Sequence, residues 1–509
     1  MRLAVSILAI ALSLPGAPAS AEPPAPAPVK GARAARPAAT APACRPGATV
    51  LDVKRPAGAE WFGLYIVNKK VGWLRTETSR ERRDGREVLV ARQEMVIEAK
   101  VGGRPVRRGQ RDEKVYEAKP EGRLLSYRSE RTGDGGDRKG ELACGPSACR
   151  ATLIADDGTT TKDLKPPAET AEQADGARVA AARCGEVAGS QFDLDRLRDK
   201  GMRDRYVKRT VLGGAGVEVP VAVVEELEDG DRMAAKVFLA DDGRTLEFRY
   251  GEALVAKAEP EEIARHTDVV DLFNVGRVAL PAALPRDVPM VIAYTFKGLP
   301  RSFAGADGRQ VVEPAADGDS LVTVTARRPA ADDPARDVPR LAPDPGGGED
   351  LEATPETDWD HPDVRALAQR VVGKTPGSWA AARKLSKEVN QRLEKVYGQS
   401  RDRASEVLRT GKGDCTEHAL LFVALARASG IPARGVHGLV YANYGERGPG
   451  LYWHAWAEVK VGDEWIPVDP TFDQDVADAT HVTLGRGTKV DDVGLIGSLA
   501  VTRAEPKAR

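Results

Sequence analysis

The stretch from Gly411 to Phe472 constrains the fold of this 509-residue chain more than any other part of its sequence. It opens with the glycine-rich GKGDC and continues as TEHALLFVALARAS, whose helical spacing ends before Gly430 and a proline. The runs GVHGLVYANY, YWHAWAEVKV and EWIPVD have strand character, and a Gly462-Asp463 turn joins the last two into a hairpin. The stretch therefore predicts an α+β unit in which a small antiparallel sheet packs on one helix.

Three polar residues stand at the element boundaries of this unit: Cys415, His454 and Asp469. The helix dipole and the free N–H groups at the helix start favour a thiolate at Cys415, and N–H groups of the turn are placed to hold an oxyanion. His454 and Asp469 lie on opposite strands of the hairpin, where they can meet as a cross-strand pair. A thiol, a base and an orienting carboxylate are the parts of a Cys-His-Asp triad, so we predict a catalytic site here.

The same stretch resembles the core of the transglutaminase-like superfamily. GDCTEHALLFVALARASGIPAR is similar to the family's nucleophile segment, YWHAWAEV to its histidine strand and WIPVDPTF to its aspartate strand. The resemblance implies an α+β core of the papain-like cysteine protease type, with Cys415 as nucleophile, His454 as base and Asp469 as orienting acid. It also implies acyl transfer through a thioester. The position of this core behind β-rich domains is similar to the layout of exported bacterial transglutaminase-like proteins.

Four further residues are candidates for contact with substrate or for support of the triad. His418 follows Cys415 by one helical turn, and its alternative role is to cap the helix or to pack in the core. Trp453 and Trp456 flank the candidate base and either shape an acyl groove or fill the core. Gln399 is a candidate oxyanion donor, with an exposed loop position as the alternative. Two other histidines are expected to be structural or to lie behind the site: His437 and His481.

The N-terminus is typical of an export signal. Met1-Arg2 supplies a positive charge, residues 3–14 form a short apolar run, and Ala19-Ser20-Ala21 is a cleavage site of the A-x-A type. We therefore predict a signal peptide over residues 1–21, a mature chain without a transmembrane segment, and a periplasmic or secreted location. The Pro- and Ala-rich residues 22–43 cannot bury a core and are predicted to form a disordered linker.

Disulfides are permitted in such an oxidising compartment. Cys144 and Cys149 lie in CGPSAC, where Gly-Pro can turn the chain back, and Cys44 and Cys184 are predicted to form a second pair. Cys415 then remains as the odd cysteine, which indicates either a reactive thiol or a buried structural residue.

The rest of the chain is predicted to be mostly β structure. Residues 44–265 are expected to form an antiparallel domain whose first hairpin begins at Glu60 and turns at Lys69-Lys70. One helical interruption is expected between Ala168 and Leu197. Four Asp-Gly pairs mark further turns, namely Asp84-Gly85, Asp157-Gly158, Asp229-Gly230 and Asp242-Gly243.

Two shorter units complete the predicted organisation. Residues 266–330 are expected to form a small β domain around the strands VPMVIAYTF and SLVTVTARR, and residues 331–354 a Pro-, Gly- and Asp-rich linker. Helical spacing returns after residue 355, so residues 355–509 are predicted to be the transglutaminase-like catalytic domain. Ser378 is the predicted N-cap of its second helix.

The charge balance and the residue spacing bear on whether the protein binds nucleic acid, a cofactor or a metal. The net charge is −1, from 75 basic and 76 acidic residues, which gives no overall field to attract nucleic acid. We predict no cofactor and no resident metal, and no acidic loop has the spacing of a calcium site. A zinc site remains an alternative to the triad, and its ligands would be Cys415, His418, His454 and Asp469.

Taken with the resemblance, these patterns predict an exported thiol-dependent acyl transferase or hydrolase that acts on peptide or carboxamide bonds. The expected partner is a peptide or protein substrate, with cell-envelope material as the natural class for the compartment. Hydrolysis is favoured over crosslinking because no feature for a second substrate is visible. The alternative is a non-catalytic envelope binding or scaffold protein that retains the fold.

Overall fold

The computed structural model describes residues 43–507 apart from short gaps. The gaps are residues 102, 134–135, 157, 215–216, 229–231, 251–253, 269, 286–289, 301–307, 345–347, 397–400, 402, 445–447, 488–494 and 496. The predicted signal peptide, nearly all of the predicted linker after it, and Gln399 therefore lie outside the described residues. Within the described part, no helix is both long enough and apolar enough to cross a membrane.

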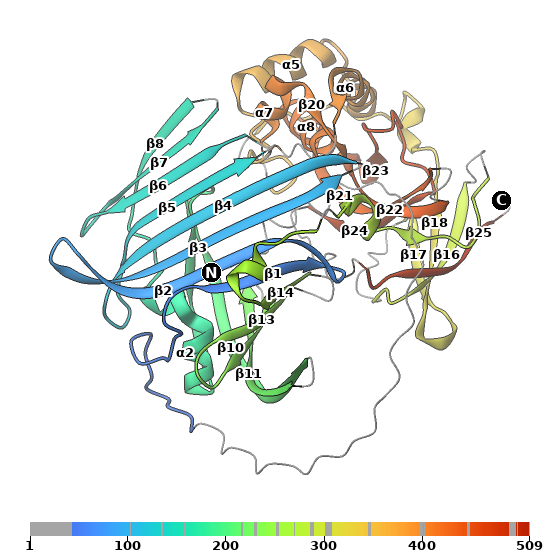
Figure 1. Cartoon of the computed structure of the whole chain (residues 1–509). Coiled ribbons are helices and arrows are strands. Elements are labelled where there is room, and N and C mark those ends of the chain that lie inside the picture. The colour runs from blue at the N-terminus through green and yellow to red at the C-terminus, as the bar shows by residue number, and fades with distance from the viewer. Residues whose placement is uncertain are drawn as a thin grey trace.

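A single antiparallel sheet of 14 strands makes up most of the N-terminal half. Its strands follow one another in space nearly as they do in sequence, with β8 and β9 at the two edges and β1 beside β14 in the interior. Figure 1 shows β2 to β8 side by side as one broad layer. The strands are β1 Glu60–Ile66, β2 Lys69–Arg83, β3 Arg86–Val101, β4 Arg104–Glu117, β5 Leu124–Gly133, β6 Arg138–Cys144, β7 Cys149–Ala155, β8 Gly158–Leu164, β9 Glu186–Asp193, β10 Arg198–Gly214, β11 Val217–Glu228, β12 Arg232–Ala240, β13 Thr245–Tyr250 and β14 Leu254–Ala258.

Short turns join most of the consecutive strands of this sheet, and a helical segment joins β8 to β9. The first hairpin turns at Val67 and Asn68, whose φ angles of 46° and 61° lie in the left-handed region that such two-residue turns require. The predicted turn at Lys69-Lys70 is therefore wrong, because these lysines already belong to β2. Asp84-Gly85 and Asp242-Gly243 connect strands as predicted. The two remaining Asp-Gly pairs fall between β7 and β8 and between β11 and β12, partly or wholly outside the described residues.

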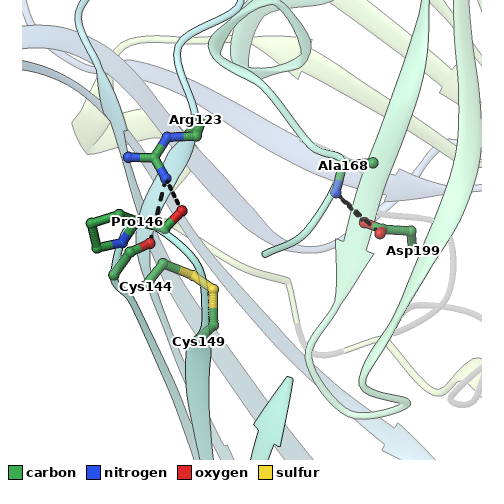
Figure 2. The surroundings of a disulfide bond; sticks show 7 residues. Arg123, Cys144, Pro146, Cys149, Ala168 and Asp199 are labelled. Carbon is green, nitrogen blue, oxygen red and sulfur yellow. Dashed lines mark hydrogen bonds between the residues drawn. A yellow bond between two sulfur atoms is a disulfide. The ribbon is translucent and has the colours of Figure 1, made fainter. Parts of the chain in front are cut away.

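Both predicted disulfides are present. Cys144–Cys149 closes the turn between β6 and β7, as Figure 2 shows, and Arg123 donates to the carbonyl oxygen of Pro146 in that turn at 3.0 Å. Cys44–Cys184 links the segment before β1 to the end of α2 (Gly176–Arg183) across 140 residues. The two bridges therefore brace the N-terminal sheet at separate places.

The helical interruption predicted between Ala168 and Leu197 is shorter than expected. It consists of the 3-10 turn η1 (Ala171–Asp175) and α2, and it ends where Cys184 takes a left-handed conformation with φ of 49°. β9 follows within two residues, so the second half of the predicted helix is a strand.

A second sheet combines two distant parts of the chain. Its order is β17-β18-β16-β25. β16 (Val291–Lys297), β17 (Gln310–Pro314) and β18 (Ser320–Thr325) come from the predicted small β domain, whereas β25 (Ala500–Pro506) comes from the end of the chain and pairs with β16. The predicted domain 355–509 therefore does not coincide with one sheet, because its last strand, β25, belongs to the small sheet.

The C-terminal unit packs four helices on a five-stranded antiparallel sheet, and Figure 1 shows these helices gathered together. The sheet order is β15-β22-β21-β24, and β23 also pairs with β22. Its elements are α5 Pro362–Val372, α6 Ser378–Arg392, α7 Ala404–Thr410, α8 Cys415–Ala428, β15 Val278–Ala279, β21 Ala433–Asn443, β22 Pro449–Val461, β23 Glu464–Val468 and β24 His481–Arg486. The remaining short elements are α3 Glu261–Ala264, α4 Leu272–Val275, η4 Ala316–Gly318, η5 Ala330–Asp332, β19 Glu394–Lys395 and β20 Lys412–Gly413.

The start of α6 is capped by a distant side chain. Gly377, and not the predicted Ser378, is the N-cap residue. The carboxylate of Asp337, from the predicted linker, accepts the N–H groups of Trp379 at 2.8 Å and Ala380 at 3.0 Å. This contact explains the error, because a cap supplied from 40 or more residues away leaves no local sequence signal.

One hydrophobic cluster joins the three largest sheets. It contains Leu64 of the large sheet, Tyr294 and Phe296 of the small sheet, and Trp453 and Val482 of the C-terminal sheet, all buried. A second cluster, formed by the helices and one face of β22 and β23, lies behind the candidate site. The candidate site thus stands on a unit whose sheet shares its core with the β-rich part of the chain.

Candidate active site

Two acidic side chains fix the helix start that carries Cys415. Asp414 is the N-cap of α8, and its carboxylate accepts the N–H of Thr416 at 3.0 Å. Glu417 accepts the N–H of Asp414 at 2.8 Å and, with its other oxygen, the N–H of Arg401 at 3.0 Å. This reciprocal arrangement is a capping box. Because the box occupies N–H groups of the first turn, fewer of them are available for an oxyanion than the sequence suggested.

Cys415 lies at a gap along one edge of β22. On this edge β22 pairs with β15 up to Leu451 and with β23 from Ala457 onwards. Between these two strands, the N–H of Ala455 donates to the sulfur of Cys415. The residue is only 4% exposed and lies outside both disulfides.

The surroundings of Cys415 oppose ionisation of its thiol. Burial raises the pKa of Cys415 well above its usual value, and the nearby carboxylate of Asp414 raises it further. The N–H of Ala455 acts in the opposite direction, because it stabilises the thiolate. The expected thiolate at the helix start is therefore not favoured in this structure, since burial and the nearby carboxylates raise the pKa of the thiol. A thiol in this environment needs a base to remove its proton.

His454 and Asp469 form a buried pair. The Nε2–H of His454 donates to Oδ2 of Asp469 at 2.8 Å, and the two residues are 5% and 0% exposed. Ala457 stands opposite Val468 in the hairpin, so Asp469 follows the end of β23 and His454 lies diagonally across from it. The two side chains thus meet across the strands as a diagonal contact, which long side chains can make.

The carboxylate of Asp469 receives four hydrogen bonds. Its Oδ2 accepts from His454 and also from Nε2 of His481 at 3.0 Å. Its Oδ1 accepts the backbone N–H groups of Thr471 at 2.8 Å and Phe472 at 3.2 Å. Burial alone would raise the pKa of Asp469, but the two histidines hold it well below its usual range. The aspartate is therefore an ionised group whose position is fixed on both oxygens.

His481 lies behind the candidate base, in contact with Asp469. It was expected to be structural or to lie behind the site, and the structure identifies its partner there as Asp469, with His481 fully buried at the start of β24. The available signal was a histidine 12 residues after the aspartate, at the start of a strand. That spacing crosses an irregular loop, so it could not predict the contact.

Two aromatic rings lie nearly parallel to the imidazole of His454. Phe472 stacks on it with ring centres 4.7 Å apart and is 43% exposed, while Trp456 lies 6.0 Å away and is fully buried. Trp453, on the other face of β22, packs into the core that joins the three sheets. Of the two predicted tryptophans, Trp456 therefore adjoins the candidate base and Trp453 fills the core. Phe472 was missed because its position depends on the loop that follows Asp469.

His418 belongs to the helix start. Its Nδ1–H donates to the carbonyl oxygen of Asp414 at 2.6 Å, and burial lowers its pKa. The same carbonyl oxygen also accepts the backbone N–H of His418 at 3.1 Å, so His418 is a buried residue of the first helical turn and does not cap it. His437, on β21, is buried against Gly485, and Gln399 lies outside the described residues.

One group of described residues has the composition of a metal site. The donor atoms of His454, Asp469 and His481 all lie within 4.8 Å of one another. The two N···O separations, 2.8 Å and 3.0 Å, are ordinary hydrogen-bond lengths. Two ligands of a tetrahedral zinc ion would stand about 3.3 Å apart, given zinc–ligand distances of about 2.0–2.1 Å. The distances therefore fit hydrogen bonds better than metal coordination. Cys415 and His418, which the zinc alternative also required, are not part of this group.

A buried thiol at a capped helix start, beside a strand that carries a histidine–aspartate pair, defines a candidate thiol–histidine–carboxylate site on an α+β unit. Residues 365–470 match the model of the Transglutaminase-like superfamily. This part of the chain is therefore a transglutaminase-like domain, which follows a large β-rich region, and the resemblance inferred from the sequence is confirmed.

Two curated relatives come from mycobacteria. An uncharacterized protein of Mycobacterium bovis and one of Mycobacterium tuberculosis are each 33% identical over 110 residues. The match covers 20% of this chain and 35% of each relative, so the chain spans about a third of the length of these relatives.

Three solved structures are similar to parts of the chain. A candidate cysteine protease from Cytophaga hutchinsonii covers 43% of this chain and 85% of its own, with 16% identity and a TM-score of 0.28. A β-barrel-like protein of unknown function, DUF1849, from Brucella abortus covers 40% and 94%, with 12% identity and a TM-score of 0.28. A candidate protease from Parabacteroides distasonis covers 68% of both chains, with 13% identity and a TM-score of 0.18. These TM-scores are too low to define a shared fold for the whole chain.

Proposed function

We propose that this protein is an exported thiol-dependent hydrolase or acyl transferase that acts on peptide or carboxamide bonds. The observation that carries the proposal is the buried His454–Asp469 pair on the strand whose Ala455 N–H contacts the sulfur of Cys415. In this proposal Cys415 is the nucleophile, His454 the base and Asp469 the group that orients the base.

The hydrogen bond between His454 and Asp469 supports a separate role for each nitrogen of His454. Because Nε2–H donates to Asp469, the neutral ring carries its free lone pair on Nδ1. Nδ1 is then the atom that takes the proton of Cys415 as the sulfur attacks the carbonyl carbon. Since burial favours the protonated thiol, the proton moves during attack and not before it.

The remaining steps balance as ordinary acyl transfer. The C–N bond of the tetrahedral intermediate breaks, and the amine or ammonia leaves with the proton held on His454. Water then attacks the thioester with His454 as base, which releases a carboxylic acid and restores the thiol. A primary amine in place of water would give crosslinking. We favour hydrolysis, since the sequence offers no feature for a second substrate.

The proposed compartment is the periplasm or the exterior of the cell. The disulfides Cys44–Cys184 and Cys144–Cys149 are compatible with an exported protein. Peptide or protein of the cell envelope is accordingly the proposed substrate class.

Substrate profiling distinguishes the catalytic proposal from the scaffold alternative. The mature protein is incubated with a peptide library rich in envelope-type and glutamine-containing sequences, with and without a fluorescent primary amine, and the products are identified by mass spectrometry. New carboxylic acids would indicate hydrolysis, and amine adducts would indicate transfer. Products that are absent with the folded Cys415→Ala variant support the proposal. Envelope binding that is equal in both proteins, without any product, would instead support a scaffold.

A further inference from the structure

The carboxylate of Asp469 is shared by two histidines from different strands. Its Oδ2 accepts from Nε2 of His454 on β22 and from Nε2 of His481 on β24, and the three residues are between 0% and 5% exposed. An ordinary triad needs only one of these contacts. The second histidine therefore requires its own explanation.

The other nitrogen of His481 also faces a carboxylate. Nδ1 lies 3.2 Å from Oδ1 of Asp478. Asp478 is itself saturated with donors, because Oδ1 accepts from Thr480 N at 2.8 Å and Oδ2 accepts from Gln474 Nε2 at 2.8 Å. Burial would raise the pKa of Asp478, but His481 and the hydrogen bonds from Thr480 hold it below its usual range. Asp478 is thus ionised, like Asp469.

An imidazole between two ionised carboxylates has only acceptors on both sides. A neutral ring carries one N–H and would set a lone pair against one of the carboxylates. Two N–H groups satisfy both contacts, and the resulting cation is paired on each side. Although burial opposes the charge on His481, the hydrogen bonds to Asp469 and Asp478 raise its pKa.

We infer that His481 is a buried imidazolium that positions Asp469 and offsets part of the negative charge that His454 faces. Its role in catalysis rests on the proposed function, whereas its charge and its contacts do not. The positive ring holds Oδ2 at the point where His454 Nε2–H binds it, which keeps the lone pair of His454 on Nδ1. Only a neutral ring with its lone pair on Nδ1 can accept the thiol proton.

The neighbouring titratable groups are consistent with this charge distribution. Cys415 and His418 of α8 lie within range of the charge of Asp469, and Tyr294 lies near Asp478. Arg309 donates to the backbone carbonyl oxygen of Asp478 and thereby adds positive charge on that side. The other groups near these elements are Asp414 and Glu417 at the start of α8 and His437 on β21.

Nitrogen NMR of the mature protein labelled with ¹⁵N-histidine tests the inference directly. The chain has six histidines, so few signals need assignment. The signals that disappear in His481→Gln belong to His481. We expect them to show two protonated nitrogens throughout about pH 5–8, whereas an ordinary histidine loses its second proton near about pH 6.5. A neutral tautomer of His481 at pH 7 would overturn the inference. Stoichiometric zinc bound to Asp469 and both histidines would overturn it as well.

Two variants test the role of His481 as a positioning residue. In His481→Gln, the introduced amide can still donate to Asp469 but carries no charge, so the ¹⁵N signals of His454, which shares Oδ2 of Asp469, should change. His266→Gln, in which an exposed histidine is replaced, should leave the His454 signals unchanged. In Asp478→Asn, His481 should titrate at lower pH than in the wild type, which provides a test that does not depend on the folding of His481→Gln. If the His454 signals and those of His481 do not move in folded variants, the inference is wrong.

The NMR measurements and the substrate profiling test the two proposals independently. An inert protein with a doubly protonated His481 would refute the proposed function but leave the assigned charge intact. An active enzyme with a neutral His481 would refute only the inference.

Discussion

The state of one thiol decides how the proposed chemistry begins. Cys415 is buried beside carboxylates, and its pKa is raised, so we expect alkylation by iodoacetamide to be slow at neutral pH and to increase with pH beyond about 8.5, the usual thiol pKa. The rate is measured by peptide mapping between pH 5 and 10, with the unfolded protein as reference. An alkylation rate that already reaches its plateau below about pH 7 would contradict this prediction, because it would reveal a thiolate in the resting protein.

Asp469 is the residue on which most of the site geometry depends. Asp469→Asn would present an N–H where the carboxylate now accepts four hydrogen bonds, and it would leave the His481 charge without one of its partners. We predict a loss of about 3–5 kcal/mol in the free energy of unfolding and loss of any turnover. Denaturant unfolding measures the first effect. Asp463→Asn, in the exposed hairpin turn, is the matched control and should change stability by less than about 0.5 kcal/mol.

At the scale of elements, the loop between β23 and β24 organises the site. It carries Asp469, Phe472 and Asp478, and Asn390 of α6 donates to the carbonyl oxygens of Pro470 and Thr471 at 2.9 Å and 3.1 Å. The ring of Phe472 covers one face of His454 while Cys415 is nearly inaccessible. The loop thus both orients the aspartate and covers one face of the candidate base.

Phe472→Ala should therefore open the site. We predict faster alkylation of Cys415 by a bulky maleimide than in the wild type, because the exposed ring that covers His454 is removed. Val311→Ala, which truncates an exposed apolar residue on the small sheet, should leave the rate unchanged. An unchanged rate in a folded Phe472→Ala variant would show that Phe472 does not control access.

Elements with strong local signals could be predicted from the sequence. The helix that begins at Cys415, the hairpin of β22 and β23, and the disulfide in CGPSAC follow from periodicity and turn residues. The cap of α6 by Asp337 and the contact of His481 with Asp469 could not be predicted, because both join residues through tertiary packing. The raised pKa of Cys415 was missed for the same reason, since desolvation depends on the whole fold.

On the scale of the whole molecule, the transglutaminase-like unit is not separate from the β-rich part. β25 returns to pair with β16, and β15 extends the sheet that carries His454. Ion pairs add to this contact: Arg138 of β6 binds Glu406 of α7, and Arg196 binds Glu356. The β-rich region therefore supports the candidate site structurally, whatever else it binds.

This organisation predicts that residues 355–509 do not fold alone. Without β16 and the large sheet, the fragment would expose Trp453, Val482 and Leu439, which now lie in the core shared by three sheets. We expect the isolated fragment to be insoluble or to lack a cooperative thermal transition, in contrast to the chain from residue 43 onwards. A soluble fragment with a sharp transition would contradict the shared core.

The most direct test of the central claim is acyl-enzyme trapping at Cys415. The mature protein is mixed with the peptide library, quenched in acid within seconds and analysed by intact mass and peptide mapping. We predict an acyl adduct on Cys415 that decays as carboxylic acid products form, that fails to form in folded Cys415→Ala, and that is strongly reduced in His454→Ala. A folded wild-type protein that forms neither adduct nor product with any peptide would contradict the assignment of Cys415, His454 and Asp469 as a working triad.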